Sequence, residues 1–301
     1  MGHDHSHEVK NYNKAFSIGI SLNIIFVIIE FTYGVMADSL ALIADAGHNL
    51  SDVVGLALAW GAFYLAKKNP TLTRTYGLRK VTILASLISA VLLFVALGAI
   101  VWEALGRFSD PQPVDSMIVI IVAAIGVVIN TVTALLFMEG QKDDLNIRGA
   151  YLHMAADAGV SLGVVIAGIA IMFTGWLWLD PVLSLIIAFV ILISTWGLFR
   201  DSVNLSIDAV PNDVDVSSIK AYFLAIKDVK EIHALHVWAI STTENALTVH
   251  LVCACIPEDN TLLEEIEEHL HHEFSIEHST IQIETNTEKY ICSLNREENK
   301  I

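Results

Sequence analysis

The sequence predicts a membrane protein of two parts, an all-α domain of six transmembrane helices followed by a smaller α+β domain. Two observations support this fold class. The 301 residues are 54% hydrophobic and only 17% charged, with a mean hydropathy of +0.58, whereas soluble domains carry about 25% charged residues. Six apolar stretches also follow one another along the chain, each near the roughly 20 residues that cross about 30 Å of hydrocarbon.

The six predicted transmembrane segments divide the chain into regions. They lie near residues 15–36, 39–66, 81–104, 115–138, 147–174 and 177–198. Together they form a predicted transmembrane domain, 15–204, which follows a polar tail, 1–14, that contains His3, His5 and His7. A second domain, 205–290, and a polar C-terminal tail, 291–301, complete the predicted organisation.

Basic residues predict the orientation of these segments. Ten lysines and arginines lie before the first segment, in the loops after the second and fourth segments, and after the sixth, whereas Arg107 stands alone on the opposite side. Cytoplasmic loops are the ones enriched in basic residues. Both termini and the C-terminal domain are therefore predicted to be cytoplasmic, in a protein that crosses the membrane several times.

The predicted cytoplasmic domain is acidic and contains both helix and strand patterns. Of the net charge of −16, the residues from 201 onward contribute −13, from 19 acidic and 6 basic side chains. This charge argues against nucleic acid or anionic lipid as the partner of the domain and suits cations. The periodicity predicts the order α-β-β-α-β, with two helices covering one face of the sheet: helices at 217–230 and 260–274, and strands at 232–241, 246–256 and 279–284.

Two of the apolar segments carry matched pairs of ionisable residues. In the second segment His48 and Asp52 are separated by four residues and therefore share one helix face, and Asp45 lies within about 60° of both. In the fifth segment His153 and Asp157 repeat the same spacing. Ionisable groups near the bilayer centre cost about 2.5 kcal/mol or more each, so two such pairs require an explanation.

A metal site explains these pairs. Two imidazole nitrogens and two carboxylate oxygens that converge from two antiparallel helices form a tetrahedral ligand set suited to Zn²⁺ or a related ion. Asp45 would lie beside this set as an accessory group for a departing ion or an arriving proton. The alternative is that the four side chains only form hydrogen bonds that hold a helix bundle together.

Histidines in the C-terminal domain suggest a second metal site. His233 and His250 fall in the first two predicted strands, and His278 and Glu284 flank the last, so that adjacent strands could bring several of them together. We interpret this group as a regulatory metal site. His269, His271 and His272 lie at the end of the acidic helix instead, where positively charged imidazoles favour the helix dipole.

Several motifs, taken in order, resemble the cation diffusion facilitators, specifically the zinc, cobalt and cadmium efflux branch that includes bacterial exporters and animal zinc transporters. The motifs are DSLALIADAGHNLSD, RTYGLRK, AYLHMAADAG, LDPVLSLIIAFVIL, HALHVW and HSTIQIE. The resemblance extends from about residue 15 to residue 285. It implies a homodimer with six spans per protomer, metal/proton antiport, and a ferredoxin-like cytoplasmic domain that contributes to dimerisation.

The resemblance also assigns residues. It places the transport site at His48, Asp52, His153 and Asp157, and the cytoplasmic site at His233, His250 and Glu284, with His278 as a further ligand. Gln282 stands where some relatives have histidine, which is a departure from the family's cytoplasmic site. The loop before the third segment, KKNPTLTRTYGLRK, has no histidine or acid, so the interface metal site of some bacterial relatives is not expected.

The expected function is therefore export of cytoplasmic Zn²⁺, or Cd²⁺ and Co²⁺, in exchange for protons, across a bacterial inner membrane. Zn²⁺ is the substrate and a regulator rather than a cofactor, and no nucleic acid partner is expected. The alternatives are an exporter that prefers Fe²⁺ or Mn²⁺, an intramembrane metalloenzyme, and a passive channel. The sequence has no HExxH motif, and a firm four-ligand site is unlike the weak coordination of a channel.

Overall fold

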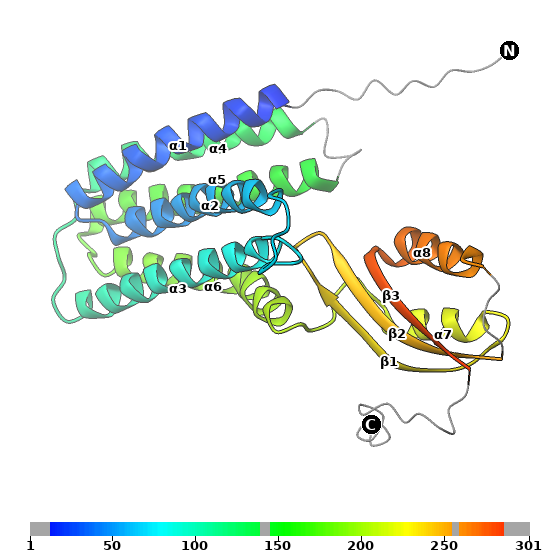
Figure 1. Ribbon diagram of the computed structural model, residues 1–301. Coiled ribbons are helices and arrows are strands. Elements are labelled where there is room, and N and C mark those ends of the chain that lie inside the picture. Colours follow the sequence, from blue (N-terminus) through cyan, green and yellow to red (C-terminus); the bar gives the residue numbers. More distant parts are fainter. Residues whose placement is uncertain (1–12, 139–144, 255–258, 286–301) are drawn as a thin grey trace, which may run out of the picture. The chain divides into compact units, whose positions relative to one another are not determined.

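The computed structural model describes residues 13–138, 145–254 and 259–285, and the chain is helical up to residue 206 (Figure 1). The helices of this part are α1 (Asn13–Met36), α2 (Leu40–Ala66), α3 (Val81–Arg107), α4 (Ser116–Phe137), α5 (Leu145–Thr174) and α6 (Leu179–Ser206). Within the described residues, α2 to α6 provide five stretches that are long and apolar enough to cross a membrane. In α1 the apolar helix Asn23–Met36 is shorter than these stretches, so the first predicted span remains a prediction.

The chain forms two compact units. The first comprises Met1–Ala57 and Ser89–Trp196, and the second comprises Leu58–Ile88 and Gly197–Ile301. The ends of α2 and α6 and the start of α3 therefore belong to the same unit as the α/β domain. The predicted tail, 1–14, lies almost wholly outside the described residues, and the tail 291–301 lies entirely outside them.

The first unit has a core of aliphatic side chains and an apolar outer surface. Phe26, Leu42 and Val164 are fully buried between the helices, whereas Val95 and Phe173 expose most of their surface. A soluble protein rarely leaves so many large apolar side chains exposed, but in a bilayer they contact lipid. The described part of the chain is therefore that of a multi-pass membrane protein.

Two glycines allow helix α4 to pack closely against its neighbours. A Cβ atom built on Gly126 would stand 2.7 Å from the ring of Phe26 on α1 and 3.1 Å from the hydroxyl of Ser161 on α5. A Cβ built on Gly168 of α5 would approach Ile120 of α4 to 2.9 Å. Small residues at helix interfaces permit such close approach in membranes.

The start of α2 is held by a carboxylate from α6. Asp180 accepts a hydrogen bond from the Ser39 hydroxyl at 2.6 Å and from the backbone N–H groups of Leu40 and Ala41 at 2.8 and 3.3 Å. Because these N–H groups belong to the first turn of a helix, they have no partner within α2, and Asp180 satisfies them. Arg107 of α3 lies 3.9 Å from the same carboxylate and binds Asp38.

The α/β domain has the predicted order of elements. Its elements are α7 (Val216–Ala225), β1 (Val229–Ala239), β2 (Asn245–Cys253), α8 (Thr261–Phe274) and β3 (Ile276–Glu284). The sheet order is β1-β2-β3, with β1 and β2 antiparallel and β2 and β3 parallel. Phe223 of α7 and Leu270 of α8 pack into one core with Leu247 and Leu251 of β2, so both helices pack on the sheet.

The first helix of this domain is shorter than predicted. Periodicity predicted a helix over 217–230, but α7 ends at Ala225 and β1 begins at Val229. Ile226 has extended backbone angles and Asp228 has a φ of 69°, so the chain turns here. The apolar residues between 226 and 232 suit a strand as well as a helix, and pairing of β1 with β2 favours the strand.

The carboxylate that holds α2 predicts a specific loss of stability. Asp180→Ala leaves the first N–H groups of α2 and the buried Ser39 hydroxyl without their partner, so we expect it to lower the free energy of unfolding by about 2 kcal/mol. The measurement is the thermal unfolding midpoint of the purified protein in detergent. Asp110→Ala, which removes an exposed carboxylate, is the control, and equal midpoints for the two variants would contradict the assigned role.

Candidate metal centres

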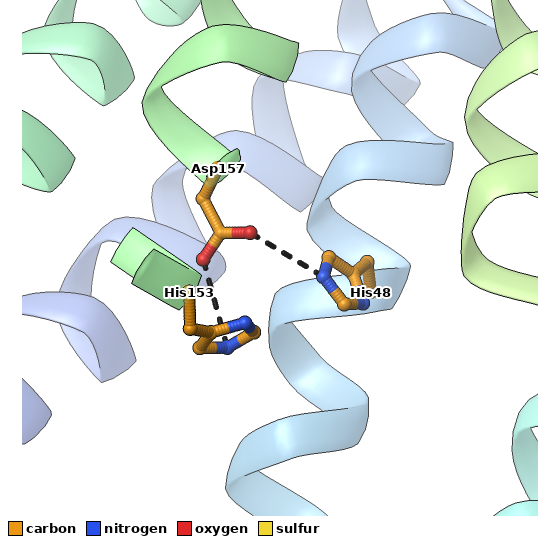
Figure 2. A group of neighbouring side chains, drawn as sticks. All are labelled: His48, His153 and Asp157. Carbon is orange, nitrogen blue, oxygen red and sulfur yellow. Dashed lines mark ion pairs between the residues drawn. The ribbon is translucent and has the colours of Figure 1, made fainter. Parts of the chain in front are cut away.

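Three of the four predicted intramembrane ligands lie together between α2 and α5. His48 projects from α2, and His153 and Asp157 project from successive turns of α5, as Figure 2 shows. Each residue offers one ligand atom, and the three atoms all lie within 4.8 Å of one another. The spacing of four residues places both α5 side chains on one face, which is the property that the sequence pattern predicted.

Asp157 is the central residue of this group. Its Oδ1 atom lies 3.4 Å from Nε2 of His48, and its Oδ2 atom lies 3.6 Å from Nε2 of His153 (Figure 2). The two imidazole rings are 5.7 Å apart and nearly perpendicular. In a tetrahedral site with ligand distances of about 2.0–2.1 Å, neighbouring ligand atoms are about 3.3 Å apart, so these separations are close to those of a metal site.

Burial differs across the group. The Asp157 side chain is 3% exposed, the His48 side chain 17% and the His153 side chain 42%. The carboxylate is thus enclosed by the helices, whereas the two imidazoles are more accessible. An ion that approaches from the His153 side would meet an exposed imidazole before the buried carboxylate.

The fourth predicted ligand, Asp52, lies one turn after His48 on α2. Its backbone is helical, but its side chain is outside the described residues. Its helical position puts it on the same face as His48, so its role as a ligand remains a prediction.

Asp45 lies in a second polar layer next to the first. It is fully buried, and the hydroxyl of Ser161 donates to its Oδ2 atom at 3.0 Å. The pairs His48 with Asp157 and Asp45 with Ser161 run in opposite directions along α2 and α5, so the two helices cross antiparallel, as predicted. Asp45 is therefore adjacent to the group of His48, His153 and Asp157 rather than part of it.

Glu30 links the first helix to this layer. It is fully buried, and it accepts a hydrogen bond from the Asn49 amide of α2 at 3.4 Å. The sequence pattern did not identify Asn49 or Ser161. The signal for Ser161 was its spacing of four residues from Asp157, which continues the polar face of α5 by one turn.

A second group of potential ligands lies on the sheet of the α/β domain. Glu284 Oε2 is 3.1 Å from Nε2 of His233, and Glu284 Oε1 is 2.9 Å from Nδ1 of His250. The two histidines are directly paired across β1 and β2, with ring centroids 4.8 Å apart. Their ligand atoms and that of Glu284 lie within 4.8 Å of one another.

Local backbone irregularity accompanies this group. The pairing of β1 with β2 is interrupted between His233 and His236, and Ala234 has a φ of 50°, which is unusual for a residue with a side chain. Such bulges redirect side chains and are frequent beside functional sites. Gln282, which stands opposite His250, donates to Glu284 Oε1 at 2.9 Å and so contacts the group as a hydrogen-bond donor.

Three histidines of the α/β domain, among the described residues, have other partners. His278 is on the same strand as Glu284 but six residues earlier, about 20 Å along it, and its ring contacts Tyr76. His269 stacks on Tyr222 at a centroid distance of 3.9 Å. His271 lies 3.5 Å from Glu277, which suits the predicted surface position at the end of α8.

Two family models match this chain. Residues 17–205 match the cation efflux transmembrane domain, and residues 211–286 match the cytoplasmic domain of cation efflux proteins. A helical membrane domain with a cluster of His and Asp side chains is thus joined to the cytoplasmic module of the same family. The chain belongs to the cation efflux family, the cation diffusion facilitators.

Curated relatives match along nearly the whole chain. The metal cation efflux system protein CzcD of Cupriavidus metallidurans is 38% identical over 286 residues, which cover 94% of this chain and 90% of the relative. The cadmium, cobalt and zinc/H⁺-K⁺ antiporter of Bacillus subtilis is 38% identical over 290 residues, 95% of this chain and 92% of the relative. The zinc transporter ZitB of Escherichia coli is 34% identical over 293 residues, 94% and 93% respectively.

These comparisons decide between the classes that the sequence left open. The relatives are named as efflux systems, antiporters and transporters, so the chain is a transporter and not an intramembrane metalloenzyme. The expected resemblance to the cation diffusion facilitators is confirmed.

The geometry of the sheet group predicts a loss of metal affinity on one substitution. Glu284→Gln replaces the only carboxylate of the His233, His250 and Glu284 group with a neutral amide, so we expect at least about tenfold weaker Zn²⁺ binding there. The measurement is calorimetric titration of the purified chain in an Asp157→Asn background, which removes the carboxylate from the candidate group between α2 and α5. Glu231→Gln, an exposed carboxylate on β1, is the control, and an equal effect in both variants would contradict the assignment.

Proposed function

We propose that this protein exports divalent transition-metal ions, Zn²⁺ first and also Cd²⁺ and Co²⁺, from the cytoplasm in exchange for protons. The observation that carries the proposal is the convergence of His48, His153 and Asp157 between two apolar helices. The names of the relatives, which include zinc, cadmium and cobalt antiport, support the same substrates.

The donor set favours these ions over others. Imidazole nitrogen with carboxylate oxygen suits Zn²⁺ and its neighbours, whereas Mg²⁺ and Ca²⁺ prefer oxygen alone. Asp52 would complete a tetrahedral set of two histidines and two aspartates. Transport then requires that the ion leave, which a site built from two separate helices permits when the helices separate.

Protons compete with the metal for the same atoms. An imidazole nitrogen or a carboxylate oxygen that binds a proton cannot bind a metal ion, and histidine changes charge near neutral pH. An inward proton gradient would therefore displace the metal toward the side where protons are abundant. Asp45, with its contact to Ser161, would be an accessory group on this path.

The proposed arrangement in the membrane follows the loop charges. Six spans within residues 15–204 and cytoplasmic termini place the α/β domain in the cytoplasm. The relatives are bacterial, and the bacterial inner membrane is the proposed location.

The α/β domain, residues 205–290, is proposed to sense metal and to contribute to a homodimer. Its order α7-β1-β2-α8-β3 is consistent with a ferredoxin-like fold. Metal at His233, His250 and Glu284 would join the two antiparallel strands to the last strand. A dimer that forms more firmly with metal bound would link transport to cytoplasmic metal abundance.

The central experiment tests Asp157, the residue that contacts both histidines. In proteoliposomes with an imposed pH gradient, we expect Asp157→Asn to reduce metal-driven proton flux at least about a hundredfold, since it removes the buried carboxylate of the site. The measurement is the fluorescence of an entrapped pH dye after addition of Zn²⁺. Asp110→Asn is the control, and flux equal to that of the unsubstituted protein in Asp157→Asn would refute the proposed site.

Replacement of an imidazole should change the preferred ion. In His153→Asp a carboxylate oxygen replaces a nitrogen ligand, so we expect transport of Zn²⁺ relative to Mn²⁺ to fall by about tenfold or more. The measurement is competition between the two ions in the same proteoliposomes. The exposed His272→Asp is the control, and an unchanged ratio in His153→Asp would show that this imidazole does not select the ion.

A further inference from the structure

A cationic cavity lies in the second unit, where α2 ends and α3 begins. It has a volume of about 600 Å³. Its walls are formed by the last turns of α2, the segment between α2 and α3, the start of α3, and the turn between β1 and β2. All of these segments belong to one compact unit.

The charges that line the cavity are unbalanced. Lys67, Lys68 and Arg79 face a single acidic residue, Glu244, which is paired with Arg79 at 3.1 Å. Within the residues that the structure describes, no carboxylate forms an ion pair with Lys67 or Lys68. The Lys67 ammonium nitrogen lies 4.2 Å from the centre of the Phe63 ring, and this cation–π contact keeps the ammonium group next to Phe63.

Uncharged polar residues complete the polar wall, namely Thr82 and Ser86 on α3 and Thr242 and Thr243 in the β1–β2 turn. The Thr82 and Ser86 hydroxyls donate to the carbonyl oxygens of Arg79 and Thr82, so the unpaired positive charge of the cavity comes from its lysines. Two ammonium groups beside one cavity form an environment for an anion with several oxygen atoms, such as a phosphate group. A metal cation would be repelled by the same lysines.

Part of the lining is apolar and comes from the last turns of α2. Ala59, Phe63 and Ala66 of α2 line the cavity, and the aromatic residues Trp60, Phe63 and Tyr64 on this last part of α2 are 56–74% exposed. Exposed aromatic residues followed directly by lysines are typical of the boundary between hydrocarbon and headgroups. Along the chain, the apolar lining residues of α2 are followed directly by the lining lysines. A phospholipid likewise has apolar acyl chains next to a charged headgroup.

We propose that this cavity binds the phosphate headgroup of an anionic phospholipid, with Lys67 and Lys68 as its principal charged contacts. Basic pockets beside transmembrane helices on the cytoplasmic side are suited to such headgroups. The α/β domain is acidic, but the carboxylate that it contributes to the cavity lining, Glu244, is already paired with Arg79. Electrostatic repulsion of an anionic headgroup by this carboxylate is therefore reduced. The proposal concerns lipid binding and does not depend on the proposed transport function.

The test measures binding to the full chain in a neutral detergent. Phosphatidylglycerol is added, bound lipid is counted by native mass spectrometry, and the thermal unfolding midpoint is recorded. We expect the double variant Lys67→Gln/Lys68→Gln to bind this lipid about tenfold more weakly than the unsubstituted protein, because each lysine near anionic lipid contributes appreciably to binding. Zwitterionic phosphatidylcholine should bind equally to both proteins.

Matched variants separate local charge from other effects. Lys220→Gln/Lys227→Gln removes two exposed lysines of the α/β domain and should bind phosphatidylglycerol normally. Lys67→Arg/Lys68→Arg keeps the charge and should restore binding, which distinguishes a lost ligand from a misfolded chain. Equal weakening in both glutamine variants, or no weakening in either, would overturn the proposal.

Soluble anions distinguish a lipid headgroup from free phosphate. Inorganic phosphate and glycerol 3-phosphate share the anionic oxygens but lack the acyl chains that the apolar wall would contact. We expect neither to raise the unfolding midpoint as phosphatidylglycerol does at the same concentration. Equal stabilisation by inorganic phosphate would overturn the assignment to a lipid and leave a phosphate site instead.

Discussion

Polar side chains in the apolar helices must find partners inside the helix bundle, because hydrocarbon offers none. His48 meets Asp157, Asp45 meets Ser161, and Glu30 meets Asn49. Each of these contacts joins two different helices, so together they specify how α1, α2 and α5 pack. A lone polar residue would weaken such a bundle, whereas these paired residues define its arrangement.

The outer contacts of the same helices give this site a fixed frame. Asp180 holds the first turn of α2, and Arg107 links that turn to α3 through Asp38. Gly126 lets α4 approach α1 and α5 closely. His48 therefore sits on a helix whose start is held by two other helices.

The grouping of the candidate ligands could be predicted from the sequence, but several of their neighbours could not. Helical spacing alone places His153 and Asp157 on one face, and the cost of charge in lipid marks them as functional. The contact of Asp45 with Ser161 depends on how two helices cross, which spacing within one helix does not reveal. Likewise, His278 and Glu284 are equally plausible ligands on one strand, and only the register of β3 against β2 brings Glu284 to His250 and leaves His278 distant.

The two candidate metal groups differ in how they are built, and this difference suits different roles. In the sheet group His233 and His250 are directly paired on adjacent strands, and Glu284 contacts both, so the three side chains are held by one hydrogen-bonded framework. In the group of His48, His153 and Asp157, the potential ligand atoms come from two helices, α2 and α5, which meet here through their side chains. A site on one rigid sheet can report whether metal is present, whereas a site divided between two helices can open. Binding and release of a transported ion require the second kind of site, since the ion must be held firmly and then lose ligands from one side.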